Sequence, residues 1–344
     1  MGKLVEVMIE LQPYIDQAPY TTDVMYKSAC GADDTTIKMW NDIWLANIKA
    51  NHEKYGPFSN QSMGVLWQEH AGKACIVAGS GPSLKLNGPL LKDRPKWMPL
   101  IACLHSFHYL EDVEAHPDYY VSLDAGEVTI PEVTEGGTRD ESEYWDRTTD
   151  RTLLAYIGSS PKLLEKWQGR ILFFNSPVPS EDFRKKCDEI EVFHQWVSTG
   201  GNVLGACMYF AKAYLGCQMV GFVGADFSFS NKGKLAFHAW PSKYDEDVGN
   251  MVKAVDIYGC PVFTWMSYYN FSMWFCYVSQ LLPGWYVNCT EGGIFGSFRE
   301  GNVRSVTQMD LAQYLKIWTI EQHHEHQAKF PGEHKPGKSD VLLV

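Results

Sequence analysis

The chain has 344 residues, of which 45% are hydrophobic and 21% are charged, so it can form a globular protein with a large buried core. Its formal net charge is −11 and it has no run of Lys and Arg, which argues against nucleic acid as the main partner. We expect no membrane span and no signal peptide, because no uncharged apolar stretch reaches the roughly 18–20 residues of a span and no basic segment precedes an apolar core at the N-terminus.

The first 70 residues are interpreted as an N-terminal helical leader. Residues 34–55 begin with Asp-Asp-Thr-Thr and carry apolar side chains at helical spacing. This pattern predicts a helix whose apolar side packs on the main domain. The apolar positions are Ile37, Trp40, Ile43, Trp44 and Ile48.

A main domain is predicted over residues 71–300, where short apolar runs alternate with helical segments. The first run, residues 74–78, ends directly in Gly79-Ser80-Gly81-Pro82-Ser83-Leu84, as a buried parallel strand does at its carboxyl end. Helices are predicted at residues 201–215 and 266–281. The alternation predicts an α/β fold of three layers around a mostly parallel sheet. Further strands are predicted at residues 100–104, 119–123, 153–157, 171–174, 219–223, 262–265 and 286–289.

Two segments do not fit the strand–helix alternation. Residues 126–150 are acidic and rich in Thr and Glu, and we interpret them as an excursion or lid outside the sheet. Residues 301–344 are predicted to form a C-terminal helix followed by a polar tail.

The nine cysteines are odd in number, lie mostly in apolar segments and form no Cys-x-x-Cys pair. Such usage is typical of reduced, buried thiols in a cytoplasmic protein. We therefore expect a cytoplasmic location, with neither a disulfide framework nor a structural zinc.

The Gly-rich turn after the first strand is the first candidate site. Glycines let backbone N–H groups approach an anion closely, and a serine hydroxyl adds a donor. The turn matches neither standard nucleotide fingerprint, GxGxxG or GxxxxGK[ST], and a plain strand-to-helix turn explains it about equally well.

Other polar endings follow predicted strands or begin predicted helices. Ser198-Thr199-Gly200-Gly201-Asn202 opens a helix, as an anion or ribose site or as a plain N-cap would. Asp226 follows the strand at 219–223, where it could bind a metal or ribose, orient a base or only cap a turn. His238 lies in a polar loop and could act as a general base, although a lone loop histidine usually has no such role. Asp124 ends another predicted strand, and so does Asn288-Cys289-Thr290-Glu291-Gly292-Gly293.

These stretches, in this order, resemble the domain of the archaeal 6-hydroxymethylpterin diphosphokinases, which also occurs in the bacterial motility-associated factors that glycosylate flagellin. The motifs are Gly79 to Leu84, Pro117-Asp118-Tyr119 through Asp124, Gly200-Gly201-Asn202-Val203, Gly224-Ala225-Asp226-Phe227, His238 and Asn288 to Gly293. The chain is more distantly similar to a bacterial sialyltransferase family with the same Gly-x-Gly-Pro-Ser-Leu opening. The resemblance covers roughly Lys73 to Gly296. The Asn-containing helix predicted over residues 47–55, before the first strand, also resembles the arrangement in the motility factors.

The resemblance implies a Rossmann-like fold and a transferase that uses a nucleotide or nucleotide-sugar donor. It implies that His238 is the general base and that Asp226 is a second catalytic residue. If the reaction depends on a metal, Asp124 and Asp226 would hold Mg²⁺. The donor-binding residues that it implies are Gly79, Ser80, Gly81, Pro82, Ser83, Asp124, Thr199, Gly200, Gly201, Asn202, Asn288, Thr290 and Glu291.

Three functions stay open at this point. A diphosphokinase would use ATP with Mg²⁺ and a flat pterin, whereas a sialic-acid-type glycosyltransferase needs a base more than a metal. The long leader and the acidic insertion exceed a minimal diphosphokinase, so we favour transfer of a sugar to a hydroxyl of a sugar, glycan or protein acceptor. The third hypothesis is a non-catalytic nucleotide-binding or assembly protein, because the aromatic segment 265–275 would suit a partner surface, including that of a homo-oligomer.

Overall fold

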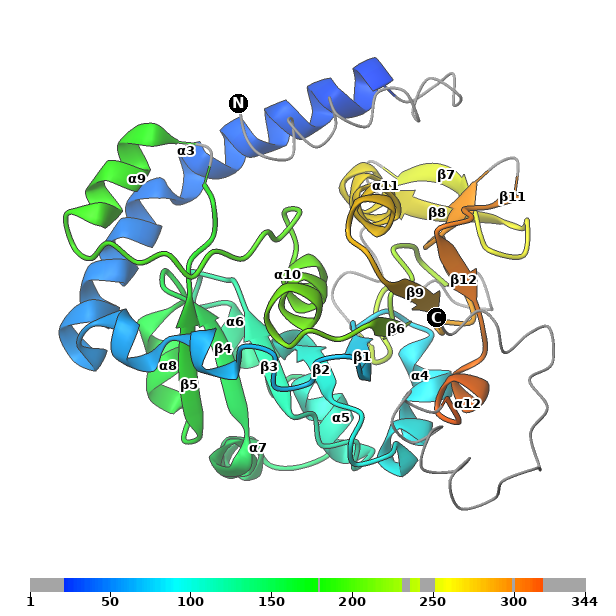
Figure 1. The fold of residues 1–344 in the computed structure, drawn as a ribbon, viewed down its shortest axis with the longest axis horizontal. Helices are drawn as coiled ribbons and strands as arrows, with labels where there is room; N and C mark the ends of the chain where they lie inside the picture. Colours follow the sequence, from blue (N-terminus) through cyan, green and yellow to red (C-terminus); the bar gives the residue numbers. More distant parts are fainter. Residues whose placement is uncertain (1–21, 179, 231–235, 242–250, 299–300, 318–344) are drawn as a thin grey trace.

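A single parallel sheet organises the computed structural model, which describes residues 22–178, 180–230, 236–241, 251–298 and 301–317 (Figure 1). The sheet has eight strands in the order β12-β9-β6-β1-β2-β3-β4-β5, and every neighbouring pair is parallel. The fold is therefore the predicted Rossmann-like α/β sandwich. The strands are β1 (Ala74–Ala78), β2 (Leu100–Cys103), β3 (Tyr119–Ser122), β4 (Thr152–Tyr156), β5 (Arg170–Phe174), β6 (Met219–Val223), β9 (Trp285–Asn288) and β12 (Val306–Gln308).

The order of the strands reverses beside β1. The chain runs from β1 through β2 to β5 on one side, then crosses back so that β6 pairs with the other side of β1. All five residues of β1 are buried, as expected for a continuous apolar strand in the middle of a parallel sheet. Open α/β sheets bind ligands at such a reversal, outside the carboxyl ends of the strands.

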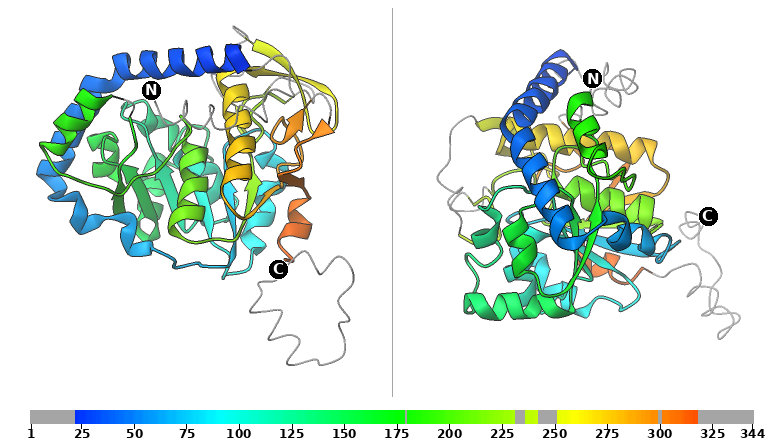
Figure 2. Two further views of the ribbon diagram at one scale, coloured as in Figure 1. Left: turned by 45° about the horizontal axis from the view of Figure 1, so that its top comes forward. Right: turned by 90° about the vertical axis from the view of Figure 1, so that its left-hand side faces the viewer.

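Helices cover both faces of the sheet (Figures 1 and 2). α10 (Val203–Tyr209) and α11 (Met266–Leu281) lie on one face, and α4 (Leu84–Asn87), α5 (Phe107–Asp112) and α12 (Leu311–Tyr314) lie on the other. The remaining helices are α3 (Thr22–Tyr55), α6 (Thr129–Glu132), α7 (Glu141–Arg147), α8 (Pro161–Lys166) and α9 (Glu181–Asp188).

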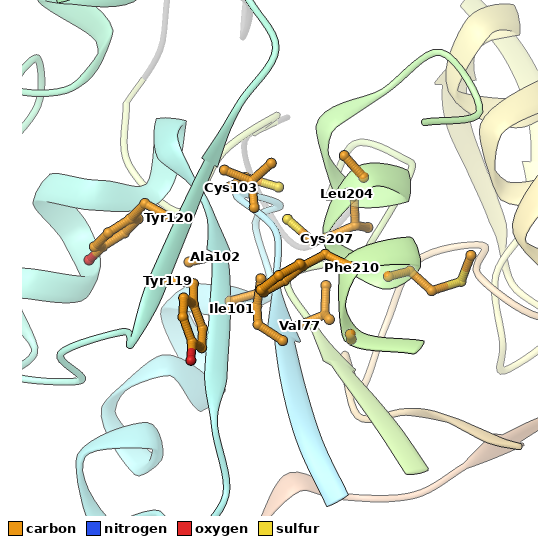
Figure 3. Packing of buried hydrophobic residues seen from close by; sticks show 14 of the residues in the cluster. Val77, Ile101, Ala102, Cys103, Tyr119, Tyr120, Leu204, Cys207 and Phe210 are labelled. Carbon is orange, nitrogen blue, oxygen red and sulfur yellow. The ribbon is translucent and has the colours of Figure 1, made fainter. Parts of the chain in front are cut away.

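The core between α10 and the sheet is built from side chains of both (Figure 3). Val77, Tyr119 and Phe210 are buried there, and the thiols of Cys103 and Cys207 face each other. Burial raises the pKa of the Cys207 thiol well above its ordinary value, which keeps it protonated. The eight cysteines whose side chains the structure describes are free.

The predicted leader helix is present as α3 and is longer than predicted, since it begins at residue 22. Two asparagines hold its C-terminal part against the sheet. Asn47 Nδ2 donates to the carbonyls of Ala125 and Gly158 at 3.0 and 3.1 Å, and Asn51 Nδ2 donates to those of residues 157 and 159 at 2.9 Å each. The chain beyond α3 then enters the main core, where Phe58 packs on Phe173.

One predicted strand lies outside the parallel sheet. β8 (Pro261–Trp265) pairs antiparallel with β7 (Met251–Val255) in a separate two-stranded sheet. The alternating burial of β8, with Phe263 exposed between buried neighbours, is typical of a strand with one solvated face. β10 (Ser297–Phe298) and β11 (Gly301–Asn302) form another short antiparallel pair. The acidic segment 126–150 contains α6 and α7 and no strand, as expected of an excursion from the sheet.

The predicted C-terminal helix lies within the described residues, and the predicted tail does not. α12 is present within residues 301–317, and the predicted polar tail after residue 317 lies outside the described residues. None of the helices in the described ranges has the length and apolar character required to cross a membrane.

Candidate functional site

A cavity of about 300 Å³ opens at the carboxyl ends of β1, β2, β3 and β6, beside the reversal of strand order. Its lining brings together predicted residues from four motifs that are far apart in the sequence. The predicted residues in the lining are Gly79, Ser80, Gly81, Asp124, Gly201, Asn202 and Asp226.

The Gly-rich turn joins the end of β1 to the end of β6. The N–H groups of Gly79 and Gly81 donate to the carbonyls of Val223 and Gly224, each at 2.9 Å. A Cβ atom on Gly81 would collide with the carboxylate of Asp226 and with the Gly224 carbonyl. Glycine is therefore required here for the close approach of two protein segments. These two N–H groups are already hydrogen-bonded within the protein.

Asp226 is the most buried carboxyl group of the site, with 5% of its surface exposed. Its Oδ2 accepts a hydrogen bond from the Ser83 hydroxyl at 2.7 Å, and the Ser83 N–H lies 3.3 Å from both oxygens. Burial raises the pKa of Asp226 to about 7, although the hydrogen bonds from Ser83 oppose the rise. The next residue, Phe227, has a φ of 49°, a left-handed conformation that turns the chain sharply after β6. Asp226 is thus a carboxyl group that can exchange a proton near neutral pH.

Asp124 is a second carboxyl group in the same cavity, just after β3. The residue is exposed to solvent at the cavity, while the protein around it still desolvates its carboxyl group. This desolvation, together with the nearby charge of Glu132, raises the pKa of Asp124 to about 6. Among the described lining residues none is Lys or Arg, so the charged groups of the cavity are chiefly acidic.

The start of α10 forms the wall beside Asp124 and Asp226. Asn202 caps the helix, and its Oδ1 accepts a hydrogen bond from the Gly205 N–H at 2.8 Å. Gly200 has a φ of 58° and lies against the ring of Trp274, which leaves no space for a side chain. Thr199 accepts a hydrogen bond from the Gly201 N–H at 3.1 Å. Gly201 and Asn202 line the cavity, whereas Thr199 and Gly200 support them.

His238 lies behind the cavity wall rather than in the described lining. Its ring is stacked on Trp240 with centroids 5.0 Å apart, and its Nδ1 lies 3.4 Å from the Ser80 carbonyl. The histidine that faces the cavity is His105, whose ring centroid is 4.5 Å from that of His238. His105 follows β2 within Cys103-Leu104-His105, where no glycine or polar cluster signals a site in the sequence.

The predicted residues after β9 are divided between support and a second cavity. Asn288 and Thr290 are buried, and Thr290 Oγ1 accepts a hydrogen bond from the Ala225 N–H at 3.2 Å. Glu291 instead lines a smaller cavity of about 80 Å³, together with Pro82 and Ser83. Asp226 lines both cavities.

Metal binding by protein groups alone has little support in the described ranges. They contain no cluster of three or more His, Cys, Asp and Glu side chains arranged to hold an ion. Asp124 and Asp226 could supply two ligands from one cavity, which suits a cation that takes its other ligands from a bound phosphate and water.

Comparison with known proteins places the chain in a family. Residues 43–232 match the family model described as 6-hydroxymethylpterin diphosphokinase MptE-like. The MAf glycosyltransferase from Magnetospirillum magneticum AMB-1 is similar in fold, with a TM-score of 0.52 and 15% sequence identity. That similarity covers 79% of this chain and 39% of the glycosyltransferase chain, and at this identity it concerns the fold alone. No curated protein matched the chain. Because the family model spans more than half of the residues, the protein belongs to the 6-hydroxymethylpterin diphosphokinase MptE-like family.

Proposed function

We propose that the protein is a nucleotide-dependent transferase that moves a sugar from a nucleotide-activated donor to an acceptor hydroxyl. The observation that carries this proposal is the larger cavity, in which two carboxyl groups with raised pKa values, Asp124 and Asp226, meet at the strand reversal. Carboxyl groups that titrate near neutral pH are common at catalytic sites. The fold shared with a MAf glycosyltransferase supports the choice of sugar transfer.

In the proposed reaction Asp226 acts as the general base. The acceptor oxygen forms a bond to the sugar carbon, while the bond from that carbon to the donor phosphate oxygen breaks and its electron pair leaves with the phosphate. The acceptor proton passes to the Asp226 carboxylate, whose pKa of about 7 matches this task near neutral pH. His238 contacts the turn through Ser80 and, in this proposal, positions it.

The acidic lining bears on how donor phosphates would be held. Phosphates beside Asp124 and Asp226 would be repelled unless a cation or protons reduce the charge. Mg²⁺ bound here would neutralise phosphate charge in the transition state, and Asp124 is the residue that would hold it while Asp226 stays free to accept the proton. The Ser80 segment and the Gly201–Asn202 segment would then contact the donor from opposite walls.

Pyrophosphoryl transfer from ATP is the second candidate function. It is favoured by the family match and by the same pair of carboxyl groups, since phosphoryl transfer depends on Mg²⁺ bridging phosphate oxygens. The third candidate, a nucleotide-binding or assembly protein without catalysis, would use the cavity for binding alone.

A calorimetric titration of the full chain with CMP, CDP, UDP, GDP, AMP and ATP, each with and without Mg²⁺, tests the proposal. We expect selective binding of a monophosphate such as CMP for sugar transfer of the sialic-acid type, and Mg²⁺-dependent binding of ATP for pyrophosphoryl transfer. No binding of any nucleotide would overturn both.

Two substitutions assign the binding to the cavity. Asp124→Asn should abolish any effect of Mg²⁺ on the nucleotide Kd, because it removes a charged ligand from the lining. The matched control is Glu127→Gln, which alters an exposed carboxylate 2.8 Å from Lys162 and should leave the Kd within about twofold. An equal effect of both variants would contradict the assignment.

A further inference from the structure

The smaller cavity lies on the other side of Asp226 from the proposed donor site. Asp226 and Ser228 line both cavities, so a ligand in either one would be close to the Asp226 carboxyl group. Its volume of about 80 Å³ has room for a few non-hydrogen atoms, since a water molecule takes about 30 Å³ in the liquid. A whole nucleotide would not fit, but one hydroxyl-bearing end of a larger molecule would.

The charged groups of the smaller cavity are carboxylates, which when ionised only accept hydrogen bonds. Asp256 is largely buried, and its Oδ1 accepts hydrogen bonds from the N–H groups of Tyr258 and Cys260 at 2.9 and 2.8 Å. Glu291 Oε1 accepts one from the Leu311 N–H at 3.2 Å. Within the described part of the chain, the second oxygen of each carboxylate has no hydrogen bond. A ligand that donates hydrogen bonds would satisfy these oxygens, whereas an anion would be repelled.

An aromatic ring stands beside these carboxylates. The Tyr258 hydroxyl donates to the Glu291 carbonyl at 3.1 Å, which holds the ring in place. The side chain is nevertheless exposed, with 65% of its surface accessible. A fixed, exposed aromatic face next to acceptor oxygens suits a ligand with an apolar C–H face and hydroxyl groups at its edge.

We propose that the smaller cavity is the acceptor subsite and that it takes the hydroxyl-bearing end of a carbohydrate that carries no anionic group. The inference rests on the proposed function, because it places the acceptor on the opposite side of Asp226 from the donor. In this arrangement Asp226 can accept the proton of an acceptor hydroxyl that enters from the smaller cavity. The acidic lining excludes carboxylated or phosphorylated ends from this position.

Gly292 offers a way to fill the smaller cavity without straining the backbone. It is absent from the residues with positive φ, and a Cβ atom there would meet only Asp226 Oδ1, at an ordinary distance of 3.8 Å. Gly292→Leu should therefore occupy the cavity, while Gly292→Ala adds a single methyl group and serves as the matched control. The neighbouring Gly293 cannot be used, because its φ is 70° and a Cβ atom would collide with the Asp226 backbone.

The inference is tested by measuring the binding of methyl glycosides with saturation-transfer NMR, in the presence and in the absence of the nucleotide that binds best. The probes are the neutral methyl glucoside and methyl galactoside, the anionic methyl glucuronide and the cationic methyl glucosaminide. We expect the neutral probes to bind the wild-type protein and Gly292→Ala and to lose at least tenfold in affinity with Gly292→Leu. The nucleotide Kd should change by less than about twofold, which also shows that the variant is folded.

Several outcomes would overturn the acceptor assignment. These are no binding of neutral glycosides to the wild-type protein, equal binding to Gly292→Leu, or preference for the glucuronide. Binding of the glucosaminide supports the assignment, because its ammonium group also donates hydrogen bonds to the carboxylates. A failure of the proposed function would give a different result. The protein would then bind no nucleotide, but it would still bind glycosides, and Gly292→Leu would still weaken that binding.

Discussion

The buried carboxyl group of Asp226 makes a quantitative prediction about stability. Its pKa is raised to about 7 in the folded protein from the ordinary value of 3.8. Below pH 3.8 the group is protonated in both the folded and unfolded states, so it has no effect on their balance. Between pH 4 and 7 the unfolded state releases the proton first, and the free energy of unfolding falls as the pH rises. Above pH 7 the loss reaches its full value.

The size of the effect follows from the two pKa values. Their difference of about three pKa units, at 1.36 kcal/mol per unit, gives a total loss of about 4 kcal/mol. At pH 5 about 2 kcal/mol of this loss is already present, because the unfolded carboxyl group is mostly ionised there. Asp226→Asn is close in shape, can still accept the Ser83 N–H and carries no charge. The stability of the variant relative to the wild type should therefore increase by about 2–3 kcal/mol as the pH rises from 5 to 8.

Urea denaturation of both proteins at pH 5, 6, 7 and 8, without Mg²⁺ or nucleotide, measures the difference. We expect the stability of Asp226→Asn relative to the wild type to rise steadily up to about pH 7 and then to level off. A difference that stays constant across this range would refute the reasoning, since Asp226 would then ionise as an exposed aspartate does. The same variant should lose transferase activity at every pH, because it has no base.

Two further predictions concern groups that support the fold rather than the cavity. Asn51→Ala should lower the free energy of unfolding, measured by urea denaturation, by about 2 kcal/mol, because it leaves the carbonyls of residues 157 and 159 without donors. The control is the surface change Asn41→Ala, which should lower it by less than about 0.5 kcal/mol. Glu111→Gln should cost about 3 kcal/mol, because the buried carboxylate pairs with Arg151 at 2.8 Å and lies 3.0 Å from His116. Its nucleotide affinity should stay unchanged, since this cluster lies at the amino end of β4, and a weakened Kd would show that the two ends of the sheet are coupled.

The parallel sheet was predictable because its strands are buried on both faces. Residues 74–78 and 219–223 are continuous apolar runs, and both predicted ranges match β1 and β6 at each end. β12 was missed because it has only three residues, and residues 262–265 were assigned to the wrong sheet. Local sequence does not specify a strand's partner, and the solvated face of β8 carries the apolar Phe263 while its polar Thr264 is buried, so nothing in the sequence indicated that face.

The site was predictable where glycines and polar residues end strands. Gly81, Asp124 and Asp226 meet in one cavity because the carboxyl ends of neighbouring parallel strands meet at one side of a sheet. The engagement of Asp226 with Ser83 could not be predicted, since it depends on a contact between residues 143 positions apart. His105 was missed for the same reason, because its place in the cavity comes from the pairing of β2 with β1.

The strand order also determines when this region can fold during synthesis. β1 takes its second partner from β6, which is synthesised more than 140 residues later. At the usual rate of translation, the ribosome needs on the order of ten seconds to add those residues. Until then one side of this apolar strand has no partner, and unpaired strands of this kind favour aggregation. The pairing of β1 with β6 is also a non-local contact, which slows folding. The nascent chain therefore has a period in which a chaperone that covers β1 would raise the yield of the folded protein.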